Sequence, residues 1–588
     1  MAAKADKFQG SYREGADPAI IIYKGDYYLF VSHSGGYWWS PDLKTWNFVT
    51  PTGLDIIDTY APGVVVVGDT VFFTACFSDG YFTTDPKGGV WHERGGYSNG
   101  GDPSYLLDDD GKLYVIDGMA GAGGCQVDRS TLQKIGNDIN TGAYGDCGAH
   151  GWECLGDDNT KTGCCGAFEG PWMNKYNGVY YLQYAAPGTE FISYGDGVYT
   201  ATNINGPYAY QDYSPFSHKP GPDGFICSAG HSCTFQDKFG NWWHVATMLV
   251  GVKNSFERRI GLFPAGFDAA GQLYTRTDLG DFPLLFPTGV RNHLQSNAIR
   301  PGWMLLSRNR PATASTGANP GNAADEDVRT GWTSGRNTAG DWLAIDLQAT
   351  CRINAVQVNF DDGNFSGDRP TGGHRYVLEA SDNGSTWSTL VDKSANTQDV
   401  PHDYVELAPP AQARYVRVRN VSMPSNSEFS LRDLRAFGLR PGNPPPAVSS
   451  PAVQRSGLGK QATISWQASS GAEGYIIRYG IAANKLYNHY QVFGKTTLTI
   501  NSLNTDVPYF FAVDAFNGGG YSSAGVTGAA STLTNGNSRK TAPRMIVGPP
   551  DLASQGPLFD VRGRRIAGAG VRRSSAGHSR SCGVYILE

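Results

Sequence analysis

Residues 24–30 read KGDYYLF, a glycine followed by aromatic and aliphatic residues, and four later stretches repeat this pattern. They are VGDTVFF around Gly68, DDDGKLYVI around Gly111, YNGVYYLQY around Gly178 and KFGNWWHVA around Gly240. Each predicts a β-hairpin, because glycine adopts the positive φ of a tight turn without strain. Successive turn glycines, starting from Gly25, are 43, 43, 67 and 62 residues apart, and a period in the forties is typical of one four-stranded propeller blade. The repeat therefore predicts a five-bladed β-propeller within residues 1–300; a β-sandwich with coincidental hairpins is the alternative.

The composition favours an all-β protein of several domains. The chain has 588 residues, too many for one hydrophobic core, and it combines 76 glycines with 12% aromatic and only 17% charged residues. Its net charge of −6 gives no reason to expect nucleic acid as a partner. No apolar run is long enough to predict a membrane span. The first residues, MAAKADKFQG, have no apolar signal core, so we expect any export signal to be absent or already removed.

A second fixed point precedes each turn glycine by eight or nine residues. Equivalent positions in successive blades form a ring around the propeller axis, so the side chains at these points should meet at one mouth of the central channel. Three carboxylates in such a pit shift one another's pKa values, which provides the acid and the base that glycoside hydrolysis requires. Singly, each would be interpreted as a turn or loop residue; their common spacing favours a site. The five residues are Asp17, Tyr60, Asp102, Glu169 and His231.

The motifs around these residues resemble those of glycoside hydrolase family 43 over about residues 10–285. They read GADPAIII, DTYAPGVVV, GDPSYLLDDDGKLY, AFEGPWMNKYNGVYYL and SAGHSCTFQDKFGNWWH. The resemblance implies that Asp17 is the general base, Glu169 the general acid, and Asp102 the third carboxylate that tunes and positions the acid. It also implies inversion of anomeric configuration, with the base and acid carboxyls roughly 6.5–9.5 Å apart.

Two further positions take their interpretation from the same resemblance. His231 resembles the family's axial histidine, which implies a calcium ion or a water beside it; a buried structural histidine is the alternative. Tyr60 stands where the family commonly has tryptophan, so we expect it to contact the sugar and to reshape its platform. A structural Ca²⁺ is the one cofactor expected, and no organic cofactor is.

Further substrate contacts are expected from aromatic and basic residues. Trp38, Trp39 and Trp172 are candidate stacking residues, because the apolar faces of sugars pack on aromatic rings; the alternative is that they belong to the blade cores. Arg259, or its neighbour Arg258, is expected to approach the acidic centre.

Eight of the ten cysteines lie between residues 76 and 233. Disulfides or free thiols are favoured, with no pairing deducible from the sequence. A zinc site is a weaker alternative because the paired C-x2-C spacing of zinc modules is missing. The stretch that holds Cys147, Cys154, Cys164 and Cys165 is an insertion directly before Glu169. It is therefore expected to border or cap the pocket. The residues that could be drawn as a zinc site are Cys147, His150, Cys154, Cys164 and Cys165.

Beyond residue 300 the sequence predicts accessory β-domains. Residues 305–440 contain alternating stretches such as VQVNF and YVRVR and resemble a discoidin-type domain of carbohydrate-binding module family 32. Residues 441–451 form a Pro-rich linker. Residues 452–533 resemble a fibronectin type III module that serves as a spacer. Residues 534–588 are either a disordered basic tail or a sorting domain for bacterial secretion machinery.

Together these features predict a secreted, inverting exo-glycosidase that removes terminal sugars from plant cell-wall oligosaccharides or polysaccharides. An α-L-arabinofuranosidase is favoured narrowly over a β-D-xylosidase. The alternatives are a β-1,3-galactosidase or endo-arabinanase of the same fold, an invertase-like fructosidase, and a non-catalytic carbohydrate-binding adhesin.

Overall fold

A computed structural model describes residues 15–523, apart from 166, 222, 250–257, 279, 295–299, 328, 362–371, 426, 450 and 457–458. Within these residues the regular structure is made of β-strands and short 3-10 turns, and there is no α-helix. It follows that no described helix could cross a membrane. The all-β prediction is confirmed for this part of the chain.

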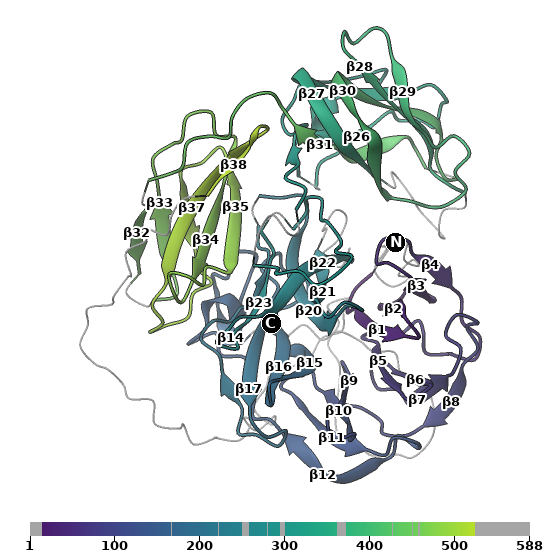
Figure 1. The fold of residues 1–588 in the computed structure, drawn as a ribbon, viewed down its shortest axis with the longest axis vertical. Helices are drawn as coiled ribbons and strands as arrows, with labels where there is room; N and C mark the ends of the chain where they lie inside the picture. Colours follow the sequence, from purple (N-terminus) through teal and green to yellow (C-terminus); the bar gives the residue numbers. More distant parts are fainter. Residues whose placement is uncertain are drawn as a thin grey trace.

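The first part of the chain folds into five successive antiparallel sheets (Figure 1). The first holds β1 (Ala19–Tyr23), β2 (Asp26–Phe30), β3 (Tyr37–Ser40) and β4 (Asn47–Val49). The second holds β5 (Gly63–Val67), β6 (Thr70–Thr74), β7 (Gly80–Thr83) and β8 (His92–Gly95). The third holds β9 (Ser104–Leu107), β10 (Leu113–Asp117), β11 (Gly123–Val127) and β12 (Lys134–Asn140).

The last two sheets have longer inner strands. The fourth holds β15 (Glu169–Tyr176), β16 (Val179–Ala186), β17 (Gly195–Ala201) and β18 (Ala209–Tyr210), with β19 (Ser217–His218) also paired to β17. The fifth holds β20 (Cys227–Gln236), β21 (Trp242–Leu249), β22 (Arg258–Phe267) and β23 (Leu273–Thr275). In all five sheets the predicted turn glycine lies at positive φ between the first two strands.

The five sheets close into a ring through their first strands. Strand β1 contacts β5, β5 contacts β9, β9 contacts β15, β15 contacts β20, and β20 contacts β1. Aromatic side chains fill the space between neighbouring sheets; Trp91, for example, packs on Phe30 and Phe73 and donates its indole N–H to Tyr37 at 3.0 Å. Large rings suit this position because the gap between splayed sheets needs volume without buried polar groups.

A second body, shown in green in Figure 1, follows the ring. Its core is one continuous cluster of buried aliphatic and aromatic residues that includes Trp332. The 3-10 turn Pro320–Ala323 packs on its strands. The strands are β24 (Met304–Leu305), β25 (Ala312–Ala314), β26 (Trp332–Thr333), β27 (Trp342–Phe360), β28 (Arg375–Ser381), β29 (Ser388–Asp392), β30 (His402–Ser422) and β31 (Ser430–Leu439).

A third body consists of two sheets around a separate core that contains Trp466 and Tyr509. One sheet has the order β32 (Ala452–Arg455), β33 (Ala462–Ser465), β36 (Thr497–Ile500). The other has the order β35 (Asn488–Phe493), β34 (Gly474–Gly480), β37 (Phe510–Asn517), β38 (Gly520–Ser522).

The third body packs back on the ring through the cysteine-containing insertion. Cys147 and Cys154 form a disulfide that spans the 3-10 turn Gly151–Glu153. The main-chain N–H of Gly151 donates to Leu503 at 2.9 Å. The side-chain amide of Asn504 donates to the main-chain carbonyls of Asp212 and Ser214 in the ring, at 3.0 and 2.9 Å. This part of the insertion therefore lies against the third body, whereas the sequence predicted that it would border or cap the pocket.

Two short strands belong to the same insertion, and the free cysteines lie elsewhere. Strands β13 (Cys154–Leu155) and β14 (Lys161–Cys165) pair beside the disulfide. His150 stacks on Tyr210, with ring centroids 3.7 Å apart, and so does not complete a zinc site with Cys147 and Cys154. Free thiols in the described part of the chain are all buried, at Cys76, Cys125, Cys227, Cys233 and Cys351.

Arg435 joins the second body to the segment that leaves the ring. Its side chain is 1% exposed and forms a two-point ion pair with Glu326, at 2.7 and 2.9 Å. It also donates to the main-chain oxygen of Asp281 at 2.7 Å and lies over the ring of Phe225, 5.2 Å from the centroid. One side chain thus contacts both bodies.

Replacing Arg435 with methionine should destabilise this junction strongly. The change leaves Glu326 buried without its cation, which typically costs about 3–5 kcal/mol of unfolding free energy. Denaturant unfolding followed by tryptophan fluorescence measures the loss. Arg414→Met is the matched control, because the Arg414 side chain is 43% exposed where it pairs with Asp346 and exposed pairs contribute little. Equal unfolding midpoints for Arg435→Met and Arg414→Met would contradict a stabilising role for the buried Arg435–Glu326 pair.

Candidate functional site

Each sheet of the ring has a residue at positive φ just before or inside its first strand, and five such residues mark the site. They are Asp17, Ala61, Asp102, Gly170 and His231, with φ between 42° and 58°. In the second and fourth sheets the residue at positive φ comes one position after the predicted residue. Ala61 follows Tyr60, and Gly170 follows Glu169. At Gly170 a Cβ atom would lie 2.6 Å from the His231 ring, so a side chain does not fit there and the acidic residue comes before it.

Asp17 is buried and held from three directions. Its main-chain N–H donates to the Thr247 hydroxyl at 2.8 Å. Its Oδ2 accepts the Ser32 hydroxyl at 2.6 Å, and its Oδ1 lies 3.4 Å from the Arg258 guanidinium. Burial alone would raise the pKa of Asp17, but the cations Arg258 and His231 and the Ser32 hydrogen bond outweigh it and lower that pKa below its usual value. Asp17 is therefore an ionised carboxylate at neutral pH.

Asp102 is equally buried but less well compensated. Its Oδ2 accepts the main-chain N–H of Gly170 at 3.1 Å, and its Oδ1 lies 3.2 Å from the Cys76 sulfur. Burial raises the pKa of Asp102 and the charge of Asp17 raises it further, so His231 only partly offsets the shift. The bond to Gly170 places Asp102 directly beside the main chain that carries Glu169.

Glu169 begins β15 and accepts the Tyr194 hydroxyl on Oε1 at 2.6 Å. Burial and the nearby charge of Asp102 raise the pKa of Glu169 to about 7. Asp17 and Glu169 therefore have pKa values shifted in opposite directions, and near neutral pH the first carboxyl can act as a base while the second can act as an acid.

His231 lies at the centre of the cluster. Its Nδ1 is 3.3 Å from Oδ1 of Asp17 and 3.8 Å from Oδ2 of Asp102. Burial would lower the pKa of His231, but the negative charges of Asp17, Asp102 and Glu169 outweigh burial and raise it. The imidazolium form thus offsets part of the negative charge in the pit.

Calcium was predicted beside His231, and the described residues do not fit an ion bound there. Calcium takes six to eight oxygen ligands, whereas His231 directs a nitrogen at the two nearest carboxylates. Among the described residues there is no group of three or more His, Cys, Asp and Glu side chains arranged to hold a metal. Arg258 and His231 are the cationic groups that face Asp17.

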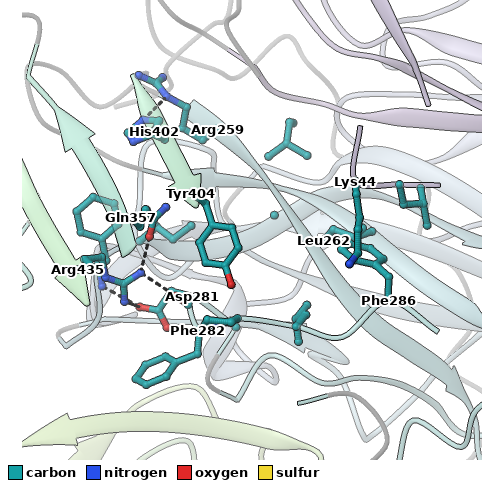
Figure 2. A pocket seen from close by; sticks show the side chains of 18 of the residues that line it. Lys44, Arg259, Leu262, Asp281, Phe282, Phe286, Gln357, His402, Tyr404 and Arg435 are labelled. Carbon is teal, nitrogen blue, oxygen red and sulfur yellow. Dashed lines mark hydrogen bonds and ion pairs between the residues drawn. The ribbon is translucent and has the colours of Figure 1, made fainter. Parts of the chain in front are cut away.

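Of the two predicted arginines, Arg258 is the one whose guanidinium contacts Asp17, at 3.4 Å. Neighbouring residues on β22 point to opposite faces of the strand, so Arg259 is directed outward and contacts His402 of the second body at 3.2 Å. There it lines a cavity of about 630 Å³ between the ring and the second body (Figure 2). None of the three carboxylates lines this cavity.

The three predicted tryptophans lie in or beside sheet cores. Trp38 is 5% exposed and packs on Phe48. The Lys87 ammonium lies 3.9 Å from the ring centroid of Trp39. Trp172 donates its indole N–H to a main-chain oxygen of β20 at 3.2 Å. In the described part of the chain, none of their hydrogen bonds or ring contacts reaches the carboxylates.

Tyr60, in contrast, lies beside the site. Its ring meets that of His33 edge-on, with centroids 4.0 Å apart. The next residue, Ala61, donates its main-chain N–H to Ser32 at 2.8 Å, and Ser32 in turn donates to Asp17. Tyr60 is partly exposed and so remains a candidate sugar contact.

Several residues that hold the carboxylates escaped the sequence reasoning, namely Ser32, Cys76, Tyr194 and Thr247. They lie outside the repeated motif, on strands and loops whose side-chain direction the spacing does not specify. The Asp-Pro and Glu-Gly-Pro signals locate only the main chain at the ring's inner edge.

Comparison with known proteins now adds to this geometry. Residues 12–267 match the family described as glycosyl hydrolases family 43. The chain carries a family 43 domain. Residues 307–434 match the F5/8 type C domain, so the family 43 domain is followed by a discoidin-like domain, as the sequence predicted.

Two curated relatives match the family 43 domain. One is named xylan 1,3-beta-xylosidase, from a Vibrio species, with 28% identity; the other is a putative beta-xylosidase of Escherichia coli strain K12, with 26% identity. Each match covers 39% of this chain and 46% of the relative, so the chain spans about half the length of these relatives. A solved xylan beta-1,4-xylosidase from Bacillus halodurans C-125 aligns over 87% of this chain and 96% of its own, with 16% identity and a TM-score of 0.39.

Proposed function

We propose that the family 43 domain hydrolyses terminal sugars of plant cell-wall polysaccharides with inversion of configuration. The single observation that carries the proposal is the group of buried Asp17 and Asp102 and partly buried Glu169 near His231, with the pKa values of Asp17 and Glu169 shifted in opposite directions. Inverting hydrolysis requires such a pair, one carboxylate that activates water and one carboxylic acid that protonates the departing oxygen.

In this mechanism Asp17 takes a proton from water while that water attacks the anomeric carbon. Glu169 donates its proton to the glycosidic oxygen as the bond breaks, and Tyr194 holds the acid in place. The reacting sugar acquires oxocarbenium character, so the anionic Asp102 stabilises the transition state electrostatically. Arg258 keeps the base ionised through its contact with Asp17.

The substrates to test first are β-D-xylosides and α-L-arabinofuranosides. The names of the two relatives support xylosides. The sequence narrowly favours arabinofuranosides, and this preference stays a prediction. The decisive experiment is a panel of nitrophenyl glycosides and cell-wall oligosaccharides with NMR detection of the product anomer. Release of a terminal sugar with inverted configuration is expected. An inert protein would favour the adhesin alternative, and a retained anomer would favour a fructosidase-like mechanism.

The pH dependence of kcat/KM should be bell-shaped. Glu169 must be protonated to act, so activity should fall as the pH rises through about 7. Asp17 and Asp102 must be ionised, and because the pKa of Asp17 is lowered while that of Asp102 is raised, the acidic limb should follow Asp102. Initial rates across the pH range measure both limbs. A descending limb near pH 4 would contradict the assignment of Glu169.

We propose that the ring is a five-bladed β-propeller and that the domains divide near residues 1–300, 305–440 and 452–533. The closed contacts of the first strands support the blade count. The strand order of the third body and the hydrogen bond between the Asn504 N–H and the Tyr509 hydroxyl, at 3.2 Å, support a fibronectin type III module with its tyrosine corner. The Cys147–Cys154 disulfide supports a secreted location. The predicted tail, residues 534–588, lies outside the described residues.

A further inference from the structure

Cys76 is a buried thiol that the mechanism above does not use. It lies two residues after β6 and is 4% exposed. Its main-chain N–H donates to the carbonyl of Tyr60 at 3.0 Å, which fixes the residue between the loops that enter the second and third sheets. The sulfur therefore lies where the main chain turns towards the carboxylates.

Two hydrogen bonds join Cys76 to Asp102. The main-chain N–H of Asp102 donates to the sulfur at 3.2 Å, and the thiol donates back to Oδ1 at 3.2 Å. With Gly170 bound to Oδ2, both oxygens of the Asp102 carboxylate have a donor. We propose that Cys76 is a positioning residue for the hydrolysis proposed above: its thiol holds Asp102, and through Gly170 it aligns the main chain that carries Glu169.

The other described free thiols lack such a contact. Cys233 and Cys351 lie near main-chain oxygens, at 3.8 and 3.4 Å. Cys125 is fully buried in β11 among apolar neighbours, and Cys227 is buried at the start of β20. In the part of the chain that the structure describes, Cys76 is the free thiol with a hydrogen bond to a carboxylate. A thiol that only filled space would not need to bond both the main chain and the side chain of one residue.

A thiol also suits a carboxylate that must keep its negative charge available. The S–H group is a weak donor, so it fixes the direction of Oδ1 with less withdrawal of charge than a hydroxyl would cause. Its hydrogen bond nevertheless lowers the pKa of Asp102 against the effect of burial. Loss of the thiol should therefore displace the carboxylate and delay its ionisation to higher pH.

The test compares Cys76→Ala, Cys76→Ser and the control Cys125→Ala in the full-length protein. Hydrogen bonds to charged groups contribute enough that Cys76→Ala should lower kcat about tenfold or more, with little change in KM, and should move the acidic limb of the pH profile to higher pH. Cys76→Ser should recover most of kcat, and its acidic limb should lie at or below the pH of the wild-type limb, because a hydroxyl is a stronger donor than a thiol. Cys125→Ala removes the same atom from a core of the ring, and it should affect thermal stability alone.

Equal pH profiles for Cys76→Ala and Cys125→Ala would overturn the proposal, and so would a Cys76→Ser variant that behaves like Cys76→Ala. Crystal structures of the two Cys76 variants give a readout that does not need activity. The Asp102 carboxylate should be displaced in the alanine variant and retained in the serine variant; an unmoved carboxylate in both would also overturn it. An inactive wild type would refute the proposed function, while these structures would still decide the role of Cys76.

Discussion

Replacing Glu169 with glutamine should lower kcat by about 10²–10⁴-fold on unactivated glycosides, because the amide cannot protonate the leaving oxygen. The loss should be much smaller on aryl glycosides with acidic phenols, since these leaving groups depart without a proton. The descending limb near pH 7 should also disappear, because it reports the ionisation of this group. Steady-state rates on a series of aryl glycosides measure all three effects.

The control for Glu169→Gln is Glu93→Gln, the same chemical change at an exposed position of β8. It should leave kcat and the pH profile unchanged. The two variants should have similar far-ultraviolet circular dichroism. If Glu169→Gln lost activity equally on good and poor leaving groups, Glu169 would not be the general acid.

Replacing Asp17 with asparagine should reduce kcat by a similar factor, about 10²–10⁴, but with the opposite dependence on substrate. The base acts on water, so the loss should be nearly the same for every leaving group. The change also removes the negative charge that faces Arg258 and His231. The pKa of His231 should therefore fall, because Asp17 is the largest of the charges that raise it.

Rates on the same aryl glycosides, together with NMR titration of His231, test this second variant. Asp110→Asn, at an exposed turn of the ring, serves as the matched control. A strong dependence on the leaving group in Asp17→Asn would mean that the roles of base and acid are exchanged.

The sequence predicted the hairpins and the position of the site because both depend on main-chain requirements. The turn glycines Gly25, Gly68 and Gly111 lie at positive φ between paired strands. A turn at positive φ favours glycine wherever it occurs. The regular spacing of these glycines along the chain therefore indicates equivalent turns in successive sheets. The approach of Asp17, Asp102 and His231 follows from the same regularity.

The parts that the sequence did not predict depend on side-chain direction and on contacts between bodies. Alternation along a strand decides that Arg258 faces Asp17 while Arg259 faces outward, and no spacing reveals which of two adjacent arginines does so. Tyr194 reaches Glu169 from a loop outside the repeat. Tryptophans such as Trp38 and Trp172 can stack on sugars. In the ring, however, both pack in a core between sheets, where large side chains fill the space.

The contacts of Leu503 and Asn504 with the ring limit how far the protein can be shortened. A truncated protein that stops after the ring would leave the main-chain N–H of Gly151 and the carbonyls of Asp212 and Ser214 without these partners. Such a fragment should aggregate more readily than the parent. The third body therefore supports the ring mechanically as well as following it in the chain, and expression trials should keep the two together.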